Sequence, residues 1–301
     1  MATLLGMRKY LDRTTALCGL SILALGAAPS ASLAGREGGV VAAGSASIEH
    51  AGRATHIRQR SNKVVIDWRG FDIATDELAQ FHQPSAASVA LNRVNSGAAS
   101  RIAGQLKANG HVMIVNPNGV VFERSARVDV NGLIATTADI DNADFMRGDF
   151  NFSRPGNPDA AIINHGQITA KEAGLVGLVA PRVENHGLIT AKLGRVELAS
   201  GDTFGVDLYG DGLFSVEVSD QVTSQLAANT GSITAEGGTI ALTAAAGRDI
   251  VNSLIHIEGE LKAPSFKQQG GKIIIGDAGR SRKAQGTVRV RGKVTAEAAS
   301  A

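Results

Sequence analysis

A short repeat is the feature of this 301-residue chain that most constrains its fold. Residues 162–170, IINHGQITA, align with residues 183–191, VENHGLITA, at a spacing of 21 residues. Residues 227–235, AANTGSITA, carry the pattern 44 residues further on, and residues 256–263 and 289–296 echo it. We expect a degenerate copy in the gap, at YGDGLFSVEVS around Leu213. Each unit reads as Asn-x-Gly-x-Ile-x-Ala, then a turn, then a second short apolar segment.

One unit is too short to bury its own apolar face, so neighbouring units must stack. If each unit is one coil of a parallel stack, every strand pairs with the same strand of the next coil. Ile and Leu then form inward ladders, and Gly and Asn take corners where φ is positive. The period excludes helical repeats of about 33 residues, and the LxxLxLxxN signature of leucine-rich repeats is absent. A propeller blade of about 40 residues would need two units. The repeat therefore favours an all-β parallel β-helix.

Composition supports short strands and tight turns. The chain has 36 Gly and only 4% aromatic residues, and no stretch sustains the apolar period of a long helix. Its 30 Lys and Arg balance 28 Asp and Glu, so neither nucleic acid nor an anionic membrane is an expected partner.

The first 160 residues are less regular, and they hold the one tryptophan, Trp68. A stack of coils needs a cap on its first coil, because an open strand edge recruits other chains. We expect this region to supply the cap. Residues 141–159 are polar and interrupted by Gly, Pro and Asn, which predicts an exposed loop.

The N-terminus has the order of a signal peptide. Arg8 and Lys9 precede an apolar run, ALCGLSILALGAA, and small residues then place a cleavage site after Ala34. An ordinary buried segment is the alternative. The only cysteine, Cys18, lies in the apolar run, so we expect a mature chain without disulfides. No later segment is apolar enough to predict a transmembrane span.

The sequence HVMIVNPNGVVF marks one turn strongly. Asn116, Pro117, Asn118 and Gly119 separate two apolar runs. Asn at the first position can bond the turn backbone, Pro presets φ at the second, and Gly is favoured at the fourth. By its chemistry alone this is a stable β-turn at a corner.

The blocks around the turn resemble a known family. IRQ, VVIDWRGFDI, FHQPSAASVALNRV, SRIAGQLKANGHVMIVNPNGVVF and GLIATTADI occur in this order. Over residues 45–142 they resemble the N-terminal secretion domain of filamentous-haemagglutinin-like exoproteins, the TpsA passengers of two-partner secretion. The resemblance implies a right-handed, single-stranded parallel β-helix of the pectin-lyase type with an N-terminal cap. It also implies export from the periplasm of a Gram-negative bacterium to its surface or surroundings. The implied partner is an outer-membrane β-barrel transporter of the TpsB type with POTRA domains.

The resemblance also implies site residues. The secretion motif carries over to Asn116, Pro117, Asn118 and Gly119, with Asn92, Arg93 and Gln83 as weaker candidates. A second motif, Asn-Pro-Asn-Leu, is missing because NSGAAS follows LNRV directly, as in the subclass that resembles high-molecular-weight adhesins. We therefore expect a signal peptide over residues 1–34, a capped secretion domain over 35–160, and β-helix coils of about 21 residues over 161–301.

Adhesion or surface binding to a receptor or glycan is the expected activity, with no catalytic residue, cofactor or metal site. The tripeptide Arg147-Gly148-Asp149 is a weak receptor-binding candidate. His165 and His186 share a repeat position and should stack about 5 Å apart, but no third metal ligand recurs with them. Two alternatives stay open: a structural matrix solenoid, and a polysaccharide-degrading enzyme. The enzyme predicts acidic and basic side chains that converge on one groove.

Overall fold

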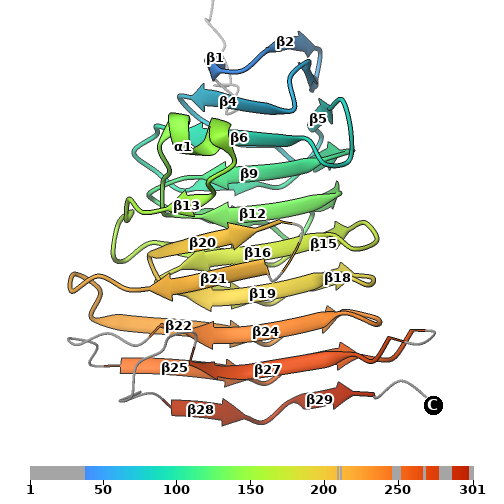
Figure 1. Ribbon diagram of the computed structural model, residues 1–301, viewed down its shortest axis with the longest axis vertical. Helices are drawn as coiled ribbons and strands as arrows, with labels where there is room; N and C mark the ends of the chain where they lie inside the picture. Colours follow the sequence, from blue (N-terminus) through green and yellow to red (C-terminus); the bar gives the residue numbers. More distant parts are fainter. Residues whose placement is uncertain are drawn as a thin grey trace, which may run out of the picture. The chain divides into compact units, whose positions relative to one another are not determined.

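Three long β-sheets run along a stack of coils, and Figure 1 shows successive coils below one another. The computed structural model describes residues 38–208, 210, 212–245, 252–266, 269–277 and 287–297, all within one unit, Ala34–Ala301. The predicted signal peptide, residues 1–34, lies outside the described residues. No helix among the described residues is long and apolar enough to cross a membrane.

From β5 (Leu78–His82) onward each complete coil gives one strand to each sheet, whereas the first coil gives none to the seven-stranded sheet. The nine-stranded sheet comprises, in spatial order, β1 (Val40–Ala43), β4 (Lys63–Trp68), β6 (Val89–Val94), β9 (His111–Val115), β12 (Gly132–Thr136), β16 (Leu175–Ala180), β19 (Arg195–Ser200), β24 (Thr239–Ala244) and β27 (Lys272–Asp277). The ten-stranded sheet comprises β2 (Ala46–Ala51), β3 (Ala54–Gln59), β5 (Leu78–His82), β8 (Gln105–Ala108), β11 (Arg127–Val130), β15 (Gln167–Ala170), β18 (Leu188–Ala191), β23 (Ser232–Thr234), β26 (Glu260–Ala263) and β29 (Lys293–Ala296). The seven-stranded sheet comprises β28 (Thr287–Val290), β25 (Asn252–Ile257), β22 (Ser224–Asn229), β17 (Arg182–Asn185), β14 (Ala161–Asn164), β10 (Val120–Phe122) and β7 (Ser100–Ile102).

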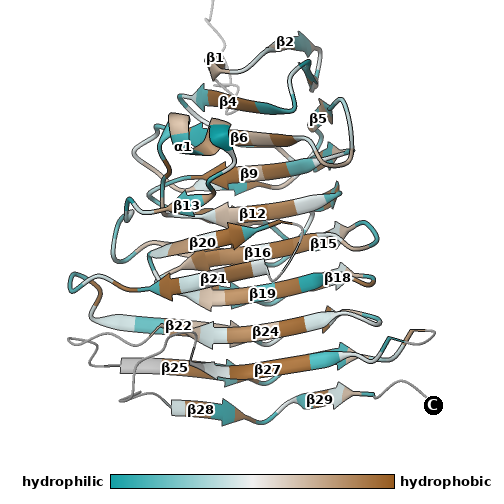
Figure 2. Cartoon of the chain, in the orientation of Figure 1, coloured by the Kyte–Doolittle hydropathy of each residue, from teal (hydrophilic) through white to brown (hydrophobic). Residues whose placement is uncertain are grey.

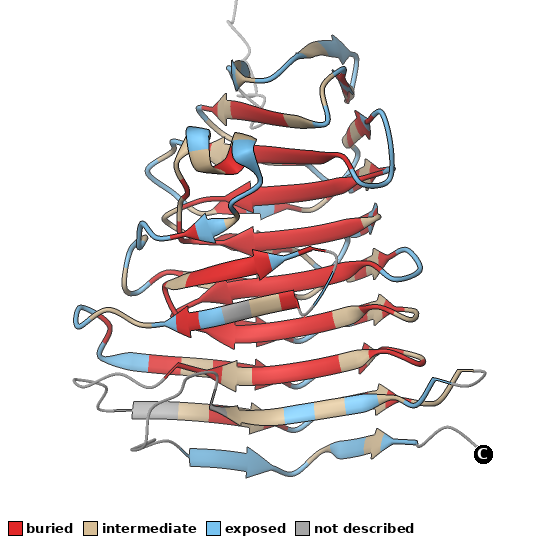
Figure 3. Ribbon diagram, in the orientation of Figure 1, coloured by how far each residue is buried: buried red, intermediate tan, exposed pale blue. Residues whose placement is uncertain are grey.

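Equivalent strands pair in parallel, in the register that the repeat predicts. Ile168 pairs with Ile189, Ile189 with Ile233, and Ile233 with Leu261. All four are buried, so they form one inward ladder. Figure 2 shows hydrophobic residues concentrated on the strands, and Figure 3 shows the strands of the middle coils buried. The predicted right-handed parallel β-helix is confirmed.

The first coil is closed by strands of opposite direction. β1 is antiparallel to β4, and β2 is antiparallel to β3, whereas the later strands of the three long sheets are parallel. Trp68 is fully buried beneath them, and its ring meets that of Phe71 edge-on at 5.3 Å. The predicted N-terminal cap is therefore present, and it covers the first edge of the stack.

The recurrent glycine serves close approach, not positive φ. Gly166, Gly187 and Gly231 share a corner position, and none of them has a positive φ. A Cβ on Gly187 would lie 2.1 Å from the carbonyl oxygen of Gly166 in the coil before. The expectation of positive φ at these corners is wrong, because the coils stack too closely there for any side chain.

The recurrent asparagine forms a ladder inside the β-helix. Asn164 Nδ2 donates to Asn185 Oδ1, and Asn185 Nδ2 donates to Asn229 Oδ1, each at 2.7 Å. All three residues are completely buried. The amides satisfy one another from coil to coil, which makes a polar residue acceptable in the core.

The gap in the repeat is an excursion, not a coil. β17 pairs directly with β22, which brings Asn185 beside Asn229, so the copy predicted around Leu213 is wrong. The chain instead leaves the stack and forms β20 (Thr203–Asp207) and β21 (Gly212–Glu217). With β13 (Asn151–Phe152) they make a three-stranded antiparallel sheet. Its apolar side chains belong to a second core on the outer face of the nine-stranded sheet.

The segment predicted as an exposed loop also helps to build this second core. It contains α1 (Asn142–Arg147), with Asp141 as N-cap and Gly148 as the left-handed residue after the helix. Phe145 and Phe152 are fully buried, and the Phe152 ring stacks on Phe204 at 4.7 Å. The loop prediction is wrong here because the helix is too short to show an apolar period, and its partners lie far away in the sequence.

Candidate functional site

The NPNG turn forms the corner between β9 and β10. Gly119 N–H donates to Asn116 O at 2.9 Å, which closes the predicted β-turn. Asn118 N–H donates to Asn116 Oδ1, also at 2.9 Å, so the first asparagine bonds the turn backbone as expected. Gly119 has φ +102, a conformation that favours glycine.

The asparagine side chains bind this turn to the preceding coil. Asn116 Nδ2 donates to Ala98 O and to Ser100 Oγ, each at 3.0 Å. Asn118 Nδ2 donates to Ser96 O at 2.9 Å. These partners belong to NSGAAS, the segment that stands directly after LNRV.

Later residues cover the turn from the other side. Asn157 N–H donates to Pro117 O at 2.9 Å, and a Cβ on Gly119 would lie 2.4 Å from Ala161 O. Asn116 is 0% exposed as a result. In the folded protein the motif is therefore an internal joint between coils, and its first asparagine is not part of the surface.

Asn92 points into the β-helix. Its Oδ1 accepts a hydrogen bond of 3.0 Å from Trp68 Nε1, and its Nδ2 donates to Met113 O at 3.2 Å. The residue is completely buried, and it links the capping tryptophan to the next two coils. Its place in the folded protein is structural.

Arg93 points outward and holds the start of α1 against the nine-stranded sheet. Its Nε donates to both carboxylate oxygens of Asp139, at 2.8 and 3.0 Å. Nη1 donates to Asp67 and Asn142, and Nη2 donates to Ile140 O at 2.7 Å. The side chain is only 12% exposed. The planar guanidinium thus joins three segments.

Gln83 lies at a different corner, between β5 and β6. Its Nε2 donates to Gln59 Oε1, Ser88 O and His111 O, at 3.1 to 3.2 Å. Its Oε1 accepts a bond of 2.9 Å from Gly110 N–H. The structure therefore places the sequence-predicted residues at separate joints of the first coils and does not gather them into one surface.

The Arg147-Gly148-Asp149 tripeptide stops α1. Gly148 has φ +96 and donates to Asp144 O and Phe145 O, and Arg147 forms ion pairs with Asp144 and Asp149. The side chains of Arg147 and Asp149 are 61% and 74% exposed. Both ends of the tripeptide lie on the surface, and its receptor role stays a prediction.

The two repeat histidines stack as predicted. The rings of His165 and His186 are 4.9 Å apart with an interplanar angle of 14°. His186 Nε2 lies 2.9 Å from Glu184 Oε2, and Nδ1 lies 2.6 Å from Thr230 Oγ1. Within the described ranges, no group of three or more His, Cys, Asp and Glu residues is placed to hold a metal ion.

Two buried ionisable residues escape prediction from the sequence. Burial under β21 raises the pKa of Glu197 to about 7, while its carboxylate accepts a bond of 3.0 Å from Leu213 N–H. Burial lowers the pKa of His111 to about 4. The sequence signal for Glu197 is a charge inside an apolar strand, but its cover comes from the excursion, which the repeat does not reveal.

Comparison with known proteins gives independent support to the family resemblance. The sequence matches the TPS secretion domain family over residues 35–290. A heme/hemopexin-binding protein of Haemophilus influenzae is 36% identical over 245 residues, which is 79% of this chain and 27% of that protein. A second protein of this description from the same species is 34% identical over 240 residues, 73% of this chain and 25% of that protein.

A solved structure has a fold similar to that of this chain. The crystal structure of the HMW1 secretion domain from Haemophilus influenzae matches with a TM-score of 0.76 and 31% identity, over 87% of this chain and 66% of that chain. The chain spans about a quarter of the length of the curated relatives that it matches. The family match covers most of the chain, with the NPNG turn inside it, and the chain belongs to the TPS secretion domain family, the export domains of two-partner secretion.

Proposed function

We propose that this chain directs export through an outer-membrane β-barrel transporter of the TpsB type with POTRA domains. A signal peptide over residues 1–34 takes the chain to the periplasm, and the transporter delivers it to the surface or surroundings of a Gram-negative bacterium. Within the exported part, residues 35–160 form the capped secretion domain, and residues 161–301 add repeat coils. Membership of the TPS secretion domain family supports this route.

The burial of Asn116 is the observation that carries the proposal furthest. Asn116 is 0% exposed in the folded coil, whereas Pro117 and Asn118 are half-buried, so the asparagine is accessible only before the coil closes. The transporter therefore reads Asn116 to Gly119 on a chain that is not yet folded, with Asn92, Arg93 and Gln83 as further contacts. After export the same residues become joints between coils.

We further propose surface binding as the role of the exported protein, with a receptor or glycan as the target class. The relatives are named for binding, to heme and hemopexin, and this is why we favour binding over catalysis. The Arg147-Gly148-Asp149 tripeptide is available for such a role because its charged side chains are exposed.

The export proposal is tested in cells with and without a TpsB-type transporter. We expect the protein in the medium only with the transporter, and an Asn116→Ala variant to remain in the periplasm. Asn185→Ala is the matched control, because Asn185 is equally buried and bonded but lies outside the motif. If both variants were lost from the medium to the same extent, the motif would only stabilise the fold and would have no separate role in recognition. Wild-type protein in the medium without the transporter would refute the route.

A further inference from the structure

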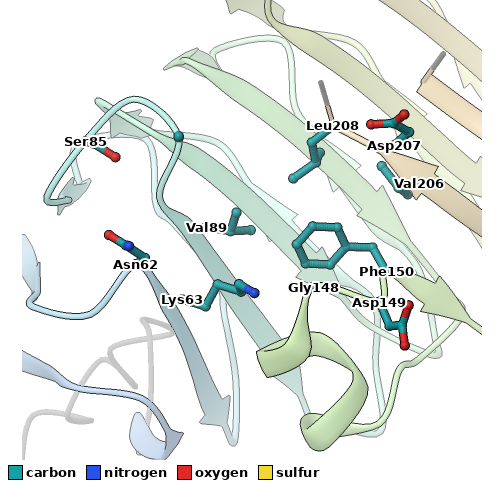
Figure 4. A pocket seen from close by; sticks show the side chains of 11 residues that line it. Asn62, Lys63, Ser85, Val89, Gly148, Asp149, Phe150, Val206, Asp207 and Leu208 are labelled. Atoms are coloured by element: carbon teal, nitrogen blue, oxygen red, sulfur yellow. The ribbon is translucent and has the colours of Figure 1, made fainter. Parts of the chain in front are cut away.

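Two cavities meet on the outer face of the nine-stranded sheet. The first has a volume of about 580 Å³, and Figure 4 shows Asn62 and Ser85 on one side of it and Phe150 and Leu208 on the other. The second has a volume of about 490 Å³. Ala87, Asp207 and Leu208 line both, so the two cavities are neighbours that share these residues as a common border. Each volume falls within the usual range of small-molecule sites, roughly 300–1,000 Å³.

The two adjacent cavities follow the axis of the stack. Strand-initial residues of successive coils lie in register: Lys63 beside Val89, Val89 beside His111, and Leu175 beside Arg195. These five residues line the two cavities. The row spans six strands, from β4 to β19, and therefore five strand spacings of about 4.8 Å, which makes it roughly 24 Å long. We call it the axial groove.

The excursion and the α1 segment form part of the wall of the axial groove. The residues from 148 to 150, after α1, contribute Phe150, and the end of β20 with the residue after it contributes Asp207 and Leu208. Phe150 packs against Phe145 at 5.5 Å, and Leu208 belongs to the second core. The wall is therefore anchored, which favours a preformed site.

The charges of the axial groove oppose a polyanionic ligand. Lys63 and Arg195 are its cations, and Asp149, Glu172 and Asp207 are its carboxylates. His111 adds no charge at neutral pH, because burial holds its pKa at about 4. The groove thus has donors and acceptors of both signs, with a small excess of negative charge.

This mixture suits a chain of uncharged sugars. Each hydroxyl of a pyranose both donates and accepts, which matches amides and carboxylates such as Asn62, Asn131 and Asp207. The apolar face of the ring can pack on Phe150, which is half-buried. A linear oligosaccharide also has the repeating, extended shape that a row of equivalent strand positions offers.

We propose that the axial groove binds a linear, uncharged oligosaccharide along the stack and releases it unchanged. The inference rests on the proposed surface-binding role for its partner class, but it places the site on the secretion domain itself. Binding is measured on purified protein without any transporter, so a failure of export and a failure of binding are separate results.

The test is calorimetric titration of the purified full chain with maltohexaose, cellohexaose and chitohexaose, and with hexagalacturonate as the acidic comparison. We expect at least one neutral hexasaccharide to bind more tightly than hexagalacturonate. Asp207→Asn removes a charged acceptor on the border that the cavities share, and should weaken that binding about tenfold. Ala87→Trp adds a large side chain at an exposed position on the same border and should abolish it.

The matched control is Asp129→Asn, an exposed carboxylate on the ten-stranded sheet, which should bind like the wild type. Circular dichroism checks that each variant is folded. Absence of neutral binding at millimolar concentrations, or preference for hexagalacturonate, would overturn the proposal. Equal binding by the wild type and Ala87→Trp would show that the site lies elsewhere. Shortened sugar products would show that the protein cleaves the oligosaccharide, which would overturn release of an unchanged ligand.

Discussion

Glu197 offers a sharp test of the second core, because a single carboxylate reports whether the excursion covers the nine-stranded sheet. The residue lies on β19 beneath β21 and is 6% exposed. Its Oε2 accepts from Leu213 N–H, and Arg195 Nη1 lies 3.7 Å from Oε1. Burial outweighs both contacts and raises the pKa from 4.5 to about 7.

The direction of the pH effect follows from proton linkage. Between pH 4.5 and pH 7 the folded protein keeps a proton on Glu197 that the unfolded chain has released. The free energy of unfolding therefore falls as pH rises through this window. The shift corresponds to about 3 kcal/mol of lost stability once the carboxylate is ionised, above pH 7. Glu197→Gln keeps the shape and the acceptor but cannot ionise.

We expect Glu197→Gln to match the wild type near pH 4 and to exceed its stability by up to ~3 kcal/mol at pH 8. Urea unfolding from pH 4 to pH 8 measures the difference. Glu49→Gln, an exposed carboxylate in the cap, is the control and should change stability by less than about 0.5 kcal/mol at any pH. A constant difference across the pH range, or a less stable variant at pH 8, would refute burial of the charge under β21.

Three further predictions concern the interior. Burial lowers the pKa of His111 to about 4, so the neutral imidazole contributes its full share to the free energy of unfolding above pH 6.5 and loses it as pH falls through 4. The His111→Gln variant cannot take up this proton. Its free energy of unfolding, measured with urea, should therefore fall less between pH 6.5 and pH 4 than that of the wild type. Asn185→Ala breaks the ladder and removes the acceptor that Asn164 Nδ2 has in the next coil, which should cost about 2–4 kcal/mol in urea unfolding. Gly187→Ala forces a Cβ to 2.1 Å from Gly166 O and should lower the melting temperature strongly, whereas Gly97→Ala, where a Cβ meets no atom within 4 Å, should not.

Periodicity made the coil predictable. Asn164, Asn185 and Asn229 occupy equivalent positions, and their spacing alone indicates parallel stacking of equivalent strands. The apolar residues between them alternate as strands require, which places Ile168 and Ile189 on the inside. These are local patterns repeated at a fixed distance, so no knowledge of distant contacts is needed.

The second core was not predictable for the opposite reason. Phe152 and Phe204 are 52 residues apart, and neither stands in a repeated motif. Nothing in either segment therefore indicates that their rings stack. The sequence of the excursion resembles a degenerate coil because Leu213 and its neighbours alternate like a repeat strand. Only the direct pairing of β17 with β22 reveals that the chain has left the stack.

The turn chemistry of NPNG was readable from the sequence, but its burial was not. Turn type depends on four adjacent residues, whereas burial depends on Ser100 before the motif and on Asn157 and Ala161 after it. The axial groove is even harder to predict from the sequence, because its lining residues extend from Asn62 to Gly212.

The positions of these covering residues give the motif a sequence of states during export. Ala98 and Ser100 precede Asn116 in the chain, but Thr136, Asn157 and Ala161 follow it. A chain that emerges with its N-terminus first can complete the joint only when residues beyond 157 are free to fold. Until then the motif stays available to the transporter that we propose, and afterwards its hydrogen bonds hold consecutive coils together. With the recognition role that we propose, the same asparagine would serve recognition and stability in turn, because the two roles would belong to different stages of one chain.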